Sequence, residues 1–333
     1  MTLGGAPITL VAGGAGFLGS HLCEALLHRG RSIVCLDNLQ TSSKANIAHL
    51  LPHPGFLFIH ADVINPLPDA VLALCSRVTQ IYNLACTASP PQYQADPEHT
   101  MLTNVVGTNH LLRFAERSGA RFLLTSTSEI YGDPEVHPQH EDYRGAVNCT
   151  GPRACYDEGK RAAEAMTFDF GRLGRADVRV ARIFNTYGPQ MHPADGRVIS
   201  NLVTQTLLGR DVIIHGDGTQ TRSFCYVSDM IRGLIALMEV DGLPLAPVNL
   251  GNPDEFSINA LLEMIVAQCG TPIRIVHHPL PIDDPRRRQP DISRAHRLLD
   301  WSPTVPLHSG LTETIAWFRQ HFGRPAPSTT HCA

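Results

Sequence analysis

Short apolar runs recur through the first 183 residues of the chain, and segments long enough for a helix separate them. The runs are Ile8–Ala12, Ser32–Leu36, Phe56–His60, Gln80–Leu84, Arg121–Thr125 and Val178–Ile183. After the first run, His21–Arg29 carries apolar residues at helical spacing. Strands that alternate with helices form βαβ units. The pattern therefore predicts an α/β fold with a Rossmann-type, doubly wound parallel sheet covered by helices on both faces.

The pattern changes near Tyr187, where Pro and Gly become more frequent and the apolar runs shorten. We expect residues 1–186 to form the parallel-sheet domain and residues 187–323 to form a smaller C-terminal α/β substrate lobe. A helix-like and a strand-like segment within about 224–252 are expected to return to the first sheet. Residues 324–333 are rich in Pro, Ser and Thr and are expected to form a disordered tail.

Composition and charge argue against several classes of function. The chain has 333 residues, 43% of them apolar, and its formal net charge of −4 argues against a nucleic-acid-binding surface. Its nine cysteines form no CxxC pair, as expected of reduced thiols in the cytoplasm. It has no apolar run of about 18 residues and no basic leader, so we expect neither a membrane span nor a signal peptide. The expected partner is a small molecule.

Three glycines follow the first predicted strand at three-residue spacing. Gly13, Gly16 and Gly19 allow a tight turn, a close approach of backbone to a pyrophosphate, and close packing of helix on strand. The following helix N-terminus adds free N–H groups and the positive end of its dipole. Phe17 and Leu18, between the glycines, are assigned to the same site. For the glycines taken alone, a plain turn is the alternative.

An acidic residue, Asp37, ends the second predicted strand about 20 residues further on. Its carboxylate can accept hydrogen bonds from both ribose hydroxyls of NAD and would repel the 2′-phosphate of NADP. Asn38 follows it, and Asp62 and Val63 follow the third strand, where Asp62 could accept from the adenine amino group. Leu84, at the end of the fourth run, completes the cofactor site that we predict for NAD.

Tyr156 and Lys160 stand four residues apart, which places both side chains on one face of a helix. A lysine beside a phenol favours the phenolate and lowers its pKa, so Tyr156 is a candidate general base. A surface pair is the alternative. Thr125–Glu129 ends a predicted strand, and ligands of doubly wound sheets bind at the carboxyl ends of strands. Together these groups predict an enzyme site.

A series of motifs, in order along the chain, resembles the extended short-chain dehydrogenases and, within them, the UDP-glucuronate decarboxylases, also called UDP-xylose synthases. The motifs include GGAGFLG, NLACTASPPQYQADP, STSEIYGDPEVHPQ, GPRACYDEGKR, RVARIFNTYGP, GDGTQTRSFCYVSDM, NLGNPDEF and DDPRRRQPDI. The resemblance implies that Thr127, Tyr156 and Lys160 form an oxidation triad and that NAD takes a hydride from C4 of the sugar. Loss of carbon dioxide from the 4-keto intermediate and re-reduction at C4 would convert UDP-glucuronate to UDP-xylose without a metal.

The choice of decarboxylase rests on Ser128, Glu129 and Arg288. In the resembling dehydratases Thr-Asp-Glu stands where this chain has Thr-Ser-Glu, and the resemblance places the Ser and Glu at the sugar carboxylate. It carries Arg288 over as the guanidinium that clamps this carboxylate, while the three consecutive arginines 286–288 leave the register open. The alternatives are an NDP-sugar 4,6-dehydratase or 4-epimerase, a decarboxylase that also rearranges the sugar ring, and a catalytically silent NAD-binding protein.

The resemblance also implies binding residues and a homodimer. It assigns the sugar to Ser89, Pro90 and Tyr93, the nucleotide sugar to Asn185, the diphosphate or uridine ribose to Arg222, and the nicotinamide half of NAD to Arg197. Two helices per subunit, near 101–117 and 153–173, would pack into a four-helix bundle. The chain departs from the family pattern at Ala12, Leu102, Arg144 and Cys149, which leaves the triad unchanged.

Overall fold

The computed structural model describes residues 5–280 and 287–323, so the predicted tail at 324–333 and Arg286 lie outside the described residues. The strands are β1 (Ile8–Ala12), β2 (Ser32–Asp37), β3 (Phe56–His60), β4 (Val78–Asn83), β5 (Arg121–Thr127), β6 (Val178–Ile183), β7 (Thr186–Tyr187), β8 (Val212–His215), β9 (Thr221–Ser223), β10 (Cys225–Tyr226), β11 (Val248–Leu250), β12 (Glu255–Ser257) and β13 (Ile275–His278).

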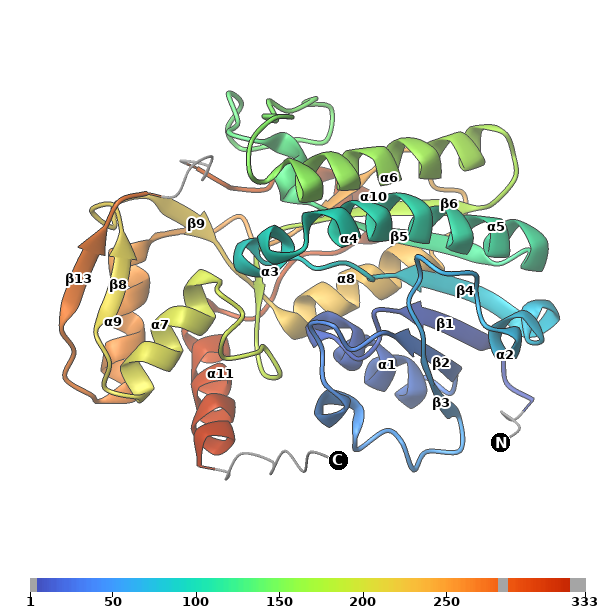
Figure 1. Cartoon of the computed structure of the whole chain (residues 1–333). Helices are drawn as coiled ribbons and strands as arrows, with labels where there is room; N and C mark the ends of the chain where they lie inside the picture. Colours follow the sequence, from blue (N-terminus) through green and yellow to red (C-terminus); the bar gives the residue numbers. More distant parts are fainter. Residues whose placement is uncertain (1–4, 281–286, 324–333) are drawn as a thin grey trace.

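The helices lie between these strands (Figure 1). They are α1 (Phe17–His28), α2 (Asp69–Leu72), α3 (Pro90–Ala95), α4 (Pro97–Leu102), α5 (Thr108–Ser118), α6 (Ala154–Arg172), α7 (Val198–Leu207), α8 (Val227–Glu239), α9 (Ile258–Cys269), α10 (Ser293–Leu299) and α11 (Leu307–Phe322), with short helical turns η1 (Lys44–Ile47), η2 (Cys75–Arg77), η3 (Thr103–Gly107) and η4 (Ser128–Tyr131). Among the described residues, no helix combines the length and apolar composition that a membrane crossing requires.

The main sheet has seven strands in the order β11-β6-β5-β4-β1-β2-β3, and every pairing in it is parallel. Successive side chains of a strand point to opposite faces. On β1, Val11 packs with α1 and α8, whereas Leu10 packs with α5 on the other face. Helices therefore cover both faces of the sheet, and the predicted doubly wound parallel sheet is confirmed.

Some predicted boundaries shift for local reasons. Strand β5 runs two residues beyond the predicted end, to Thr127, because its polar end still pairs with Ala181–Ile183 of β6. Helix α1 begins at Phe17 rather than His21, because the glycine turn leads directly into it. The helix predicted near 101–117 is present as one helical run, within which a π-helical turn, η3, lies between α4 and α5. There the Asn104 side chain donates to the carbonyl of Thr100 at 3.0 Å, in competition with its own backbone N–H.

The second lobe packs α7, α9 and α11 around their own apolar cluster, beside the two-stranded pairs β8–β13 and β9–β12 (Figure 1). The chain then crosses back: α8 packs against the main sheet and β11 pairs with β6 at its edge. We propose this division, with 224–252 belonging to the first lobe, as the domain organisation. It places the carboxyl ends of the main strands toward the second lobe.

Candidate active site

The glycine turn after β1 has no space for side chains. Gly13 has φ 77°, and a Cβ there would lie 2.7 Å from the backbone of Leu84 and Ala85. A Cβ on Gly19 would lie 2.0 Å from the carbonyl oxygen of Gly13. Gly16 is the N-cap of α1 and provides no side-chain hydrogen bond, so the first N–H groups of the helix are not capped by a side chain. The turn is therefore shaped to receive an anionic group at a helix N-terminus.

Asp37 connects this turn to the loop after β2. Its Oδ2 accepts from the N–H of Ala15 at 2.9 Å, and its Oδ1 accepts from Leu39 N at 2.8 Å and Ser42 Oγ at 2.7 Å. Asp62 is similarly engaged, accepting from Asn38 Nδ2 at 2.8 Å and contacting His99 Nε2 at 2.7 Å. Both carboxylates thus brace the loops around the site, and their predicted contacts with ribose and adenine remain predictions.

Two adjoining cavities, of about 780 and about 80 Å³, open at this edge of the sheet. The predicted cofactor residues Gly13, Gly16, Phe17, Leu18, Gly19, Leu84, Tyr156, Lys160 and Arg197 line the larger cavity. Asp37, Asn38, Asp62 and Val63 line the smaller one, which shares Gly13, Gly16 and Leu84 with the larger. The structure thus brings together every residue that the sequence assigned to the cofactor, in a space of the size usual for ligand sites.

Tyr156 and Lys160 lie on the buried face of α6, below the end of β5. The Lys160 ammonium donates to the carbonyl of Thr125 at 2.9 Å. Burial raises the pKa of Tyr156, which the neighbouring Thr127 hydroxyl acts to lower, and burial lowers the pKa of Lys160. The expectation that Lys160 lowers the pKa of Tyr156 is therefore not met in the protein alone, because desolvation of the phenolate is the dominant effect.

A cluster of charges follows directly at Ser128 and Glu129. Arg288 is buried, its Nη1 lies 3.4 Å from Ser128 Oγ, and it pairs with one oxygen of Glu129, while Arg153 pairs with the other. Burial would raise the pKa of Glu129, but Arg288 and Arg153 outweigh it and bring the pKa to about 2. Of the two described arginines in the triplet, Arg288 is the buried one and Arg287 is exposed. Glu129 is thus an anion held between two cations.

The predicted substrate residues fall into three places. Asn185 lines the larger cavity. Ser89 is the N-cap of α3 and is buried beside Pro90, and the ring of Tyr93 stacks on Tyr156 with centroids 5.2 Å apart. Arg222 lies on β9, where its Nη1 donates to the carbonyl of Thr221 at 2.8 Å, and it lines neither cavity.

Comparison with known proteins gives the family. The model of the NAD dependent epimerase/dehydratase family matches residues 9–251. UDP-glucuronic acid decarboxylase 1 of Xenopus tropicalis is 49% identical over 317 residues, which cover 95% of this chain and 73% of the relative. UDP-glucuronic acid decarboxylase 3 of Arabidopsis thaliana is 50% identical, over 95% of this chain and 90% of the relative. The chain belongs to the NAD dependent epimerase/dehydratase family. Within it, the predicted resemblance to the UDP-glucuronic acid decarboxylases is confirmed.

Solved structures of this family share the fold. The UDP-glucuronic acid 4-epimerase of Bacillus cereus, crystallised with UDP-glucuronic acid and NAD, superposes with a TM-score of 0.85 at 29% identity, over 94% of this chain and 99% of the epimerase. The predicted NAD cofactor therefore agrees with the family and with its structural relatives.

The residues of this family member fit NAD. The glycine turn lacks the side chains that would fill the approach to the N-terminus of α1, and an acidic residue ends β2. By this arrangement the glycines would hold the pyrophosphate, Asp37 would face the adenosine ribose, and Tyr156 and Lys160 would border the nicotinamide.

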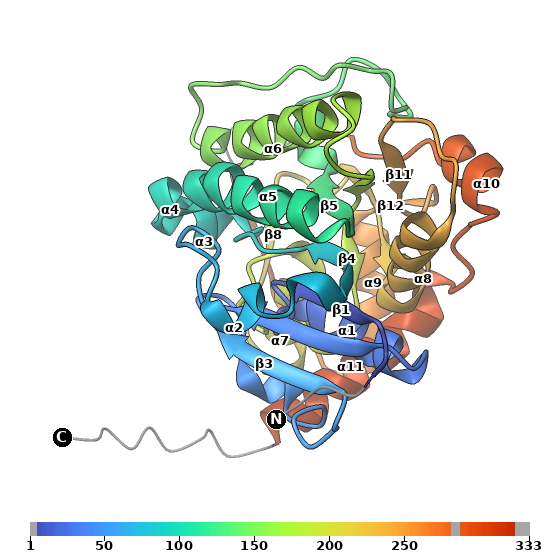
Figure 2. The same ribbon diagram turned by 90° about the vertical axis from the view of Figure 1, so that its right-hand side faces the viewer.

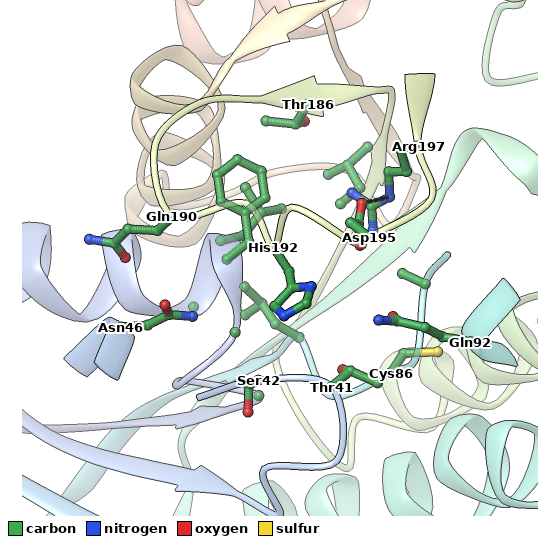
Figure 3. A pocket seen from close by; sticks show the side chains of 18 of the residues that line it. Thr41, Ser42, Asn46, Cys86, Gln92, Thr186, Gln190, His192, Asp195 and Arg197 are labelled. Carbon is green, nitrogen blue, oxygen red and sulfur yellow. Dashed lines mark ion pairs between the residues drawn. The ribbon is translucent and has the colours of Figure 1, made fainter. Parts of the chain in front are cut away.

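Apart from Arg197, the residues of the loop between β7 and α7 were not predicted from the sequence, although this loop supplies much of the cavity wall in this family member. Figure 3 shows Gln190, His192 and Asp195 of this loop around the cavity, with Asp195 paired to Arg197 at 3.1 Å. Ser20 Oγ on α1 donates to Gln190 Oε1 at 2.5 Å, across the boundary between the lobes. The loop has no periodic pattern, so only its tertiary position could identify it.

Arg153 was also missed. It lies in the quoted motif GPRACYDEGKR, one turn before Asp157 on the same helix face, but nothing in the sequence pairs it with Glu129. A buried arginine of this kind needs a carboxylate partner, and the partner comes from another element.

Proposed function

We propose that this protein decarboxylates UDP-glucuronate to UDP-xylose through a UDP-4-keto intermediate. The observation that carries the proposal is the position of Arg288. It is buried beside Ser128 and Glu129, and these two residues follow Thr127 and line the same cavity as Tyr156. The segment 127–129 thus carries Thr127, which is suited to the oxidation step, next to two residues that contact Arg288. The guanidinium of Arg288 is suited to binding a carboxylate. The decarboxylase relatives support the same reaction.

The oxidation step needs a base at the C4 hydroxyl of the sugar. Tyr156 Oη takes this proton, and Thr127, which lines the same cavity as Tyr156, holds the C4 oxygen in place. Lys160 is anchored on the Thr125 carbonyl and keeps a positive charge below the phenol as it becomes negative. NAD, when bound, supplies the hydride acceptor for C4 and returns the same hydride at the end of the cycle.

The decarboxylation step follows from the ketone. The C6 carboxylate lies β to the C4 carbonyl, so the C5–C6 bond can break with its electron pair passing into the enolate at C4. The enolate oxygen takes hydrogen bonds from Thr127 and Tyr156, carbon dioxide leaves, and a proton is added at C5. Arg288 orients the carboxylate for this cleavage, and the Glu129 anion fixes the guanidinium.

The test is incubation of the protein with UDP-glucuronate and NAD, with carbon dioxide release measured and the sugar product identified by NMR. We expect UDP-xylose. Turnover of UDP-glucose or dTDP-glucose in place of UDP-glucuronate would contradict the proposal and would indicate the 4-epimerase or 4,6-dehydratase alternative. Ser128, which stands where the dehydratase pattern has Asp, argues against the dehydratase.

The protein is also proposed to be a homodimer through a four-helix bundle. Helices α4, α5 and α6 lie side by side on one side of the sheet (Figure 2). Apolar side chains on them stay partly exposed, among them Val105, Val106 and Met166, and Leu102 is 37% exposed. Such a face is typical of a helix-packed interface.

Light scattering at micromolar concentration should therefore give about twice the chain mass of 36.4 kDa. Leu102→Glu should shift the mass toward the monomer, because it places a charge in the packed face. The matched control is Leu208→Glu in the second lobe, where the leucine is 40% exposed and the dimer should persist. A monomeric mass for the unaltered protein would contradict the proposal.

A further inference from the structure

His192 lies in the loop between β7 and α7 and has no part in the mechanism above. Figure 3 shows its ring extending from this loop into the larger cavity, which it lines together with Gly16 and Phe17 at the start of α1. His192 does not line the smaller cavity, where Asp37 would face the adenosine ribose. It therefore belongs to the part of the site that lies beyond the adenosine.

The loop that carries His192 is held against the first turns of α1. The ring of His21 contacts the carbonyl of Pro189 at 2.9 Å, and Ser20 Oγ donates to Gln190 Oε1 at 2.5 Å. Gln190 has φ 68°, which is uncommon for a residue other than glycine, and such a conformation persists where the surrounding contacts hold it. These contacts bring the loop to the end of α1 where the glycine turn would receive the pyrophosphate.

Contacts with α7 hold the other end of the loop. Thr204 Oγ1 donates to the carbonyl of Pro193 at 3.2 Å, and Asn201 Nδ2 donates to the carbonyl of Gly196 at 3.0 Å. The position of His192 between these anchors is therefore set by the protein itself. A contact from such a residue costs little conformational entropy when a ligand binds.

The hydrogen bonding of His192 directs one N–H donor at the cavity. Its Nδ1 accepts from the N–H of Ala194 at 3.1 Å, so the proton of the neutral ring is on Nε2. Within residues 5–280 and 287–323, Nε2 makes no hydrogen bond. A donor that faces a cavity beside an anion-binding helix N-terminus is suited to a phosphate oxygen.

We propose that His192 closes the pyrophosphate site of NAD from the second lobe. Its Nε2–H donates to a phosphate oxygen, while the N-terminus of α1 supplies donors from the first lobe. His192 binds the cofactor and takes no part in proton or hydride transfer. The inference depends on the NAD cofactor of the family and is independent of the proposed substrate.

Two variants separate the roles of the two ring nitrogens. In His192→Asn the side-chain oxygen can still accept from the N–H of Ala194, as Asn38 Oδ1 accepts from Gln40 N at 3.0 Å, but no donor reaches the position of Nε2. In His192→Gln the longer side chain brings an amide N–H to about the reach of Nε2, but it offers no acceptor in the position of Nδ1.

The test measures the rate at which NAD bound to the holoenzyme exchanges with isotopically labelled NAD. His192→Asn should speed the exchange at least about tenfold, because the loss of a hydrogen bond to a charged group appears mainly in the dissociation rate. His192→Gln should stay within about threefold of the unaltered protein, because it keeps the donor. Exchange in His192→Gln as fast as, or faster than, that in His192→Asn would overturn the proposal.

Displacement of bound NAD by ADP-ribose identifies the group that His192 contacts. Both ligands carry the pyrophosphate, so an equal excess of ADP-ribose should displace the same fraction of NAD from the unaltered protein and from His192→Asn. A larger displaced fraction in His192→Asn would place the contact on the nicotinamide and overturn the proposal. Neither measurement needs turnover, so failure of the proposed decarboxylation and failure of this inference are seen separately.

Discussion

Replacing Tyr156 by Phe is expected to lower kcat for UDP-glucuronate by about 1,000-fold, within the range that general acid–base groups contribute. The substitution removes the hydroxyl that takes the C4 proton. The ring that stacks on Tyr93, with centroids 5.2 Å apart, stays in place, so the fold and NAD binding should be retained. The rate of UDP-xylose formation by NMR and the NAD content of the purified protein measure the two effects separately.

The matched control for this experiment is Tyr187→Phe. Tyr187 is also a buried tyrosine, and its hydroxyl donates to the carbonyl of Leu307 at 3.2 Å, away from Tyr156. Loss of the Tyr187 hydroxyl should change kcat by less than about threefold, because removing this hydrogen bond affects only the free energy of unfolding. Turnover by Tyr156→Phe at the level of this control would contradict the role of Tyr156 as base.

Arg288→Ala is expected to lower kcat/KM for UDP-glucuronate by about 100-fold or more, because loss of a buried charged partner typically costs about 2–5 kcal/mol. The variant leaves the substrate carboxylate unclamped and leaves Glu129 with Arg153 as its remaining arginine partner. NAD content should be unchanged, since the described hydrogen bonds of the Arg288 side chain are to Ser128, Glu129 and Gly132 and not to the glycine turn.

Arg287→Ala is the matched control, because it removes the same charge from the adjacent residue, whose side chain is exposed rather than buried. It should leave kcat/KM within about twofold, as expected for a solvated side chain. An equal loss in both variants would indicate a general charge effect of the arginine triplet. A parallel loss of NAD from Arg288→Ala would indicate that Arg288 has a structural role.

The fold could be predicted from sequence because its strands are buried on both faces. Ile8–Ala12 and Val178–Ile183 are strands with the predicted bounds, since both are largely buried and their apolar residues form short, compact runs. The prediction missed features where polar residues continue an element, as at Thr127, or where a π-helical turn lies within a helix, as at η3, in which Asn104 bonds the Thr100 carbonyl. In both cases the deciding contact is made with a carbonyl or a neighbouring strand that a local pattern does not report.

The candidate site divides in the same way. The glycine turn and Asp37 are readable because their spacing is local and their geometry follows from strand, turn and helix. The partnership of Arg153 with Glu129 spans 24 residues, and that of Arg288 with Glu129 spans 159. Such pairs depend on which elements the fold brings together, so the resemblance could carry Arg288 over with its register open, whereas the burial of Arg288 beside Glu129 comes from the structure.

The end of β5 also has a consequence for the length of the substrate. Thr127 and Ser128 are consecutive, with Cα atoms about 3.8 Å apart, so the residue proposed for the C4 oxygen lies next to a residue that contacts Arg288, the group proposed for the carboxylate. In the sugar, one carbon separates C4 from the carboxylate carbon. The spacing of these residues therefore fixes the distance between the C4 oxygen and the carboxylate of the substrate that fits. A homologous sugar acid with one more methylene before its carboxylate could place either its C4 oxygen or its carboxylate correctly, but not both.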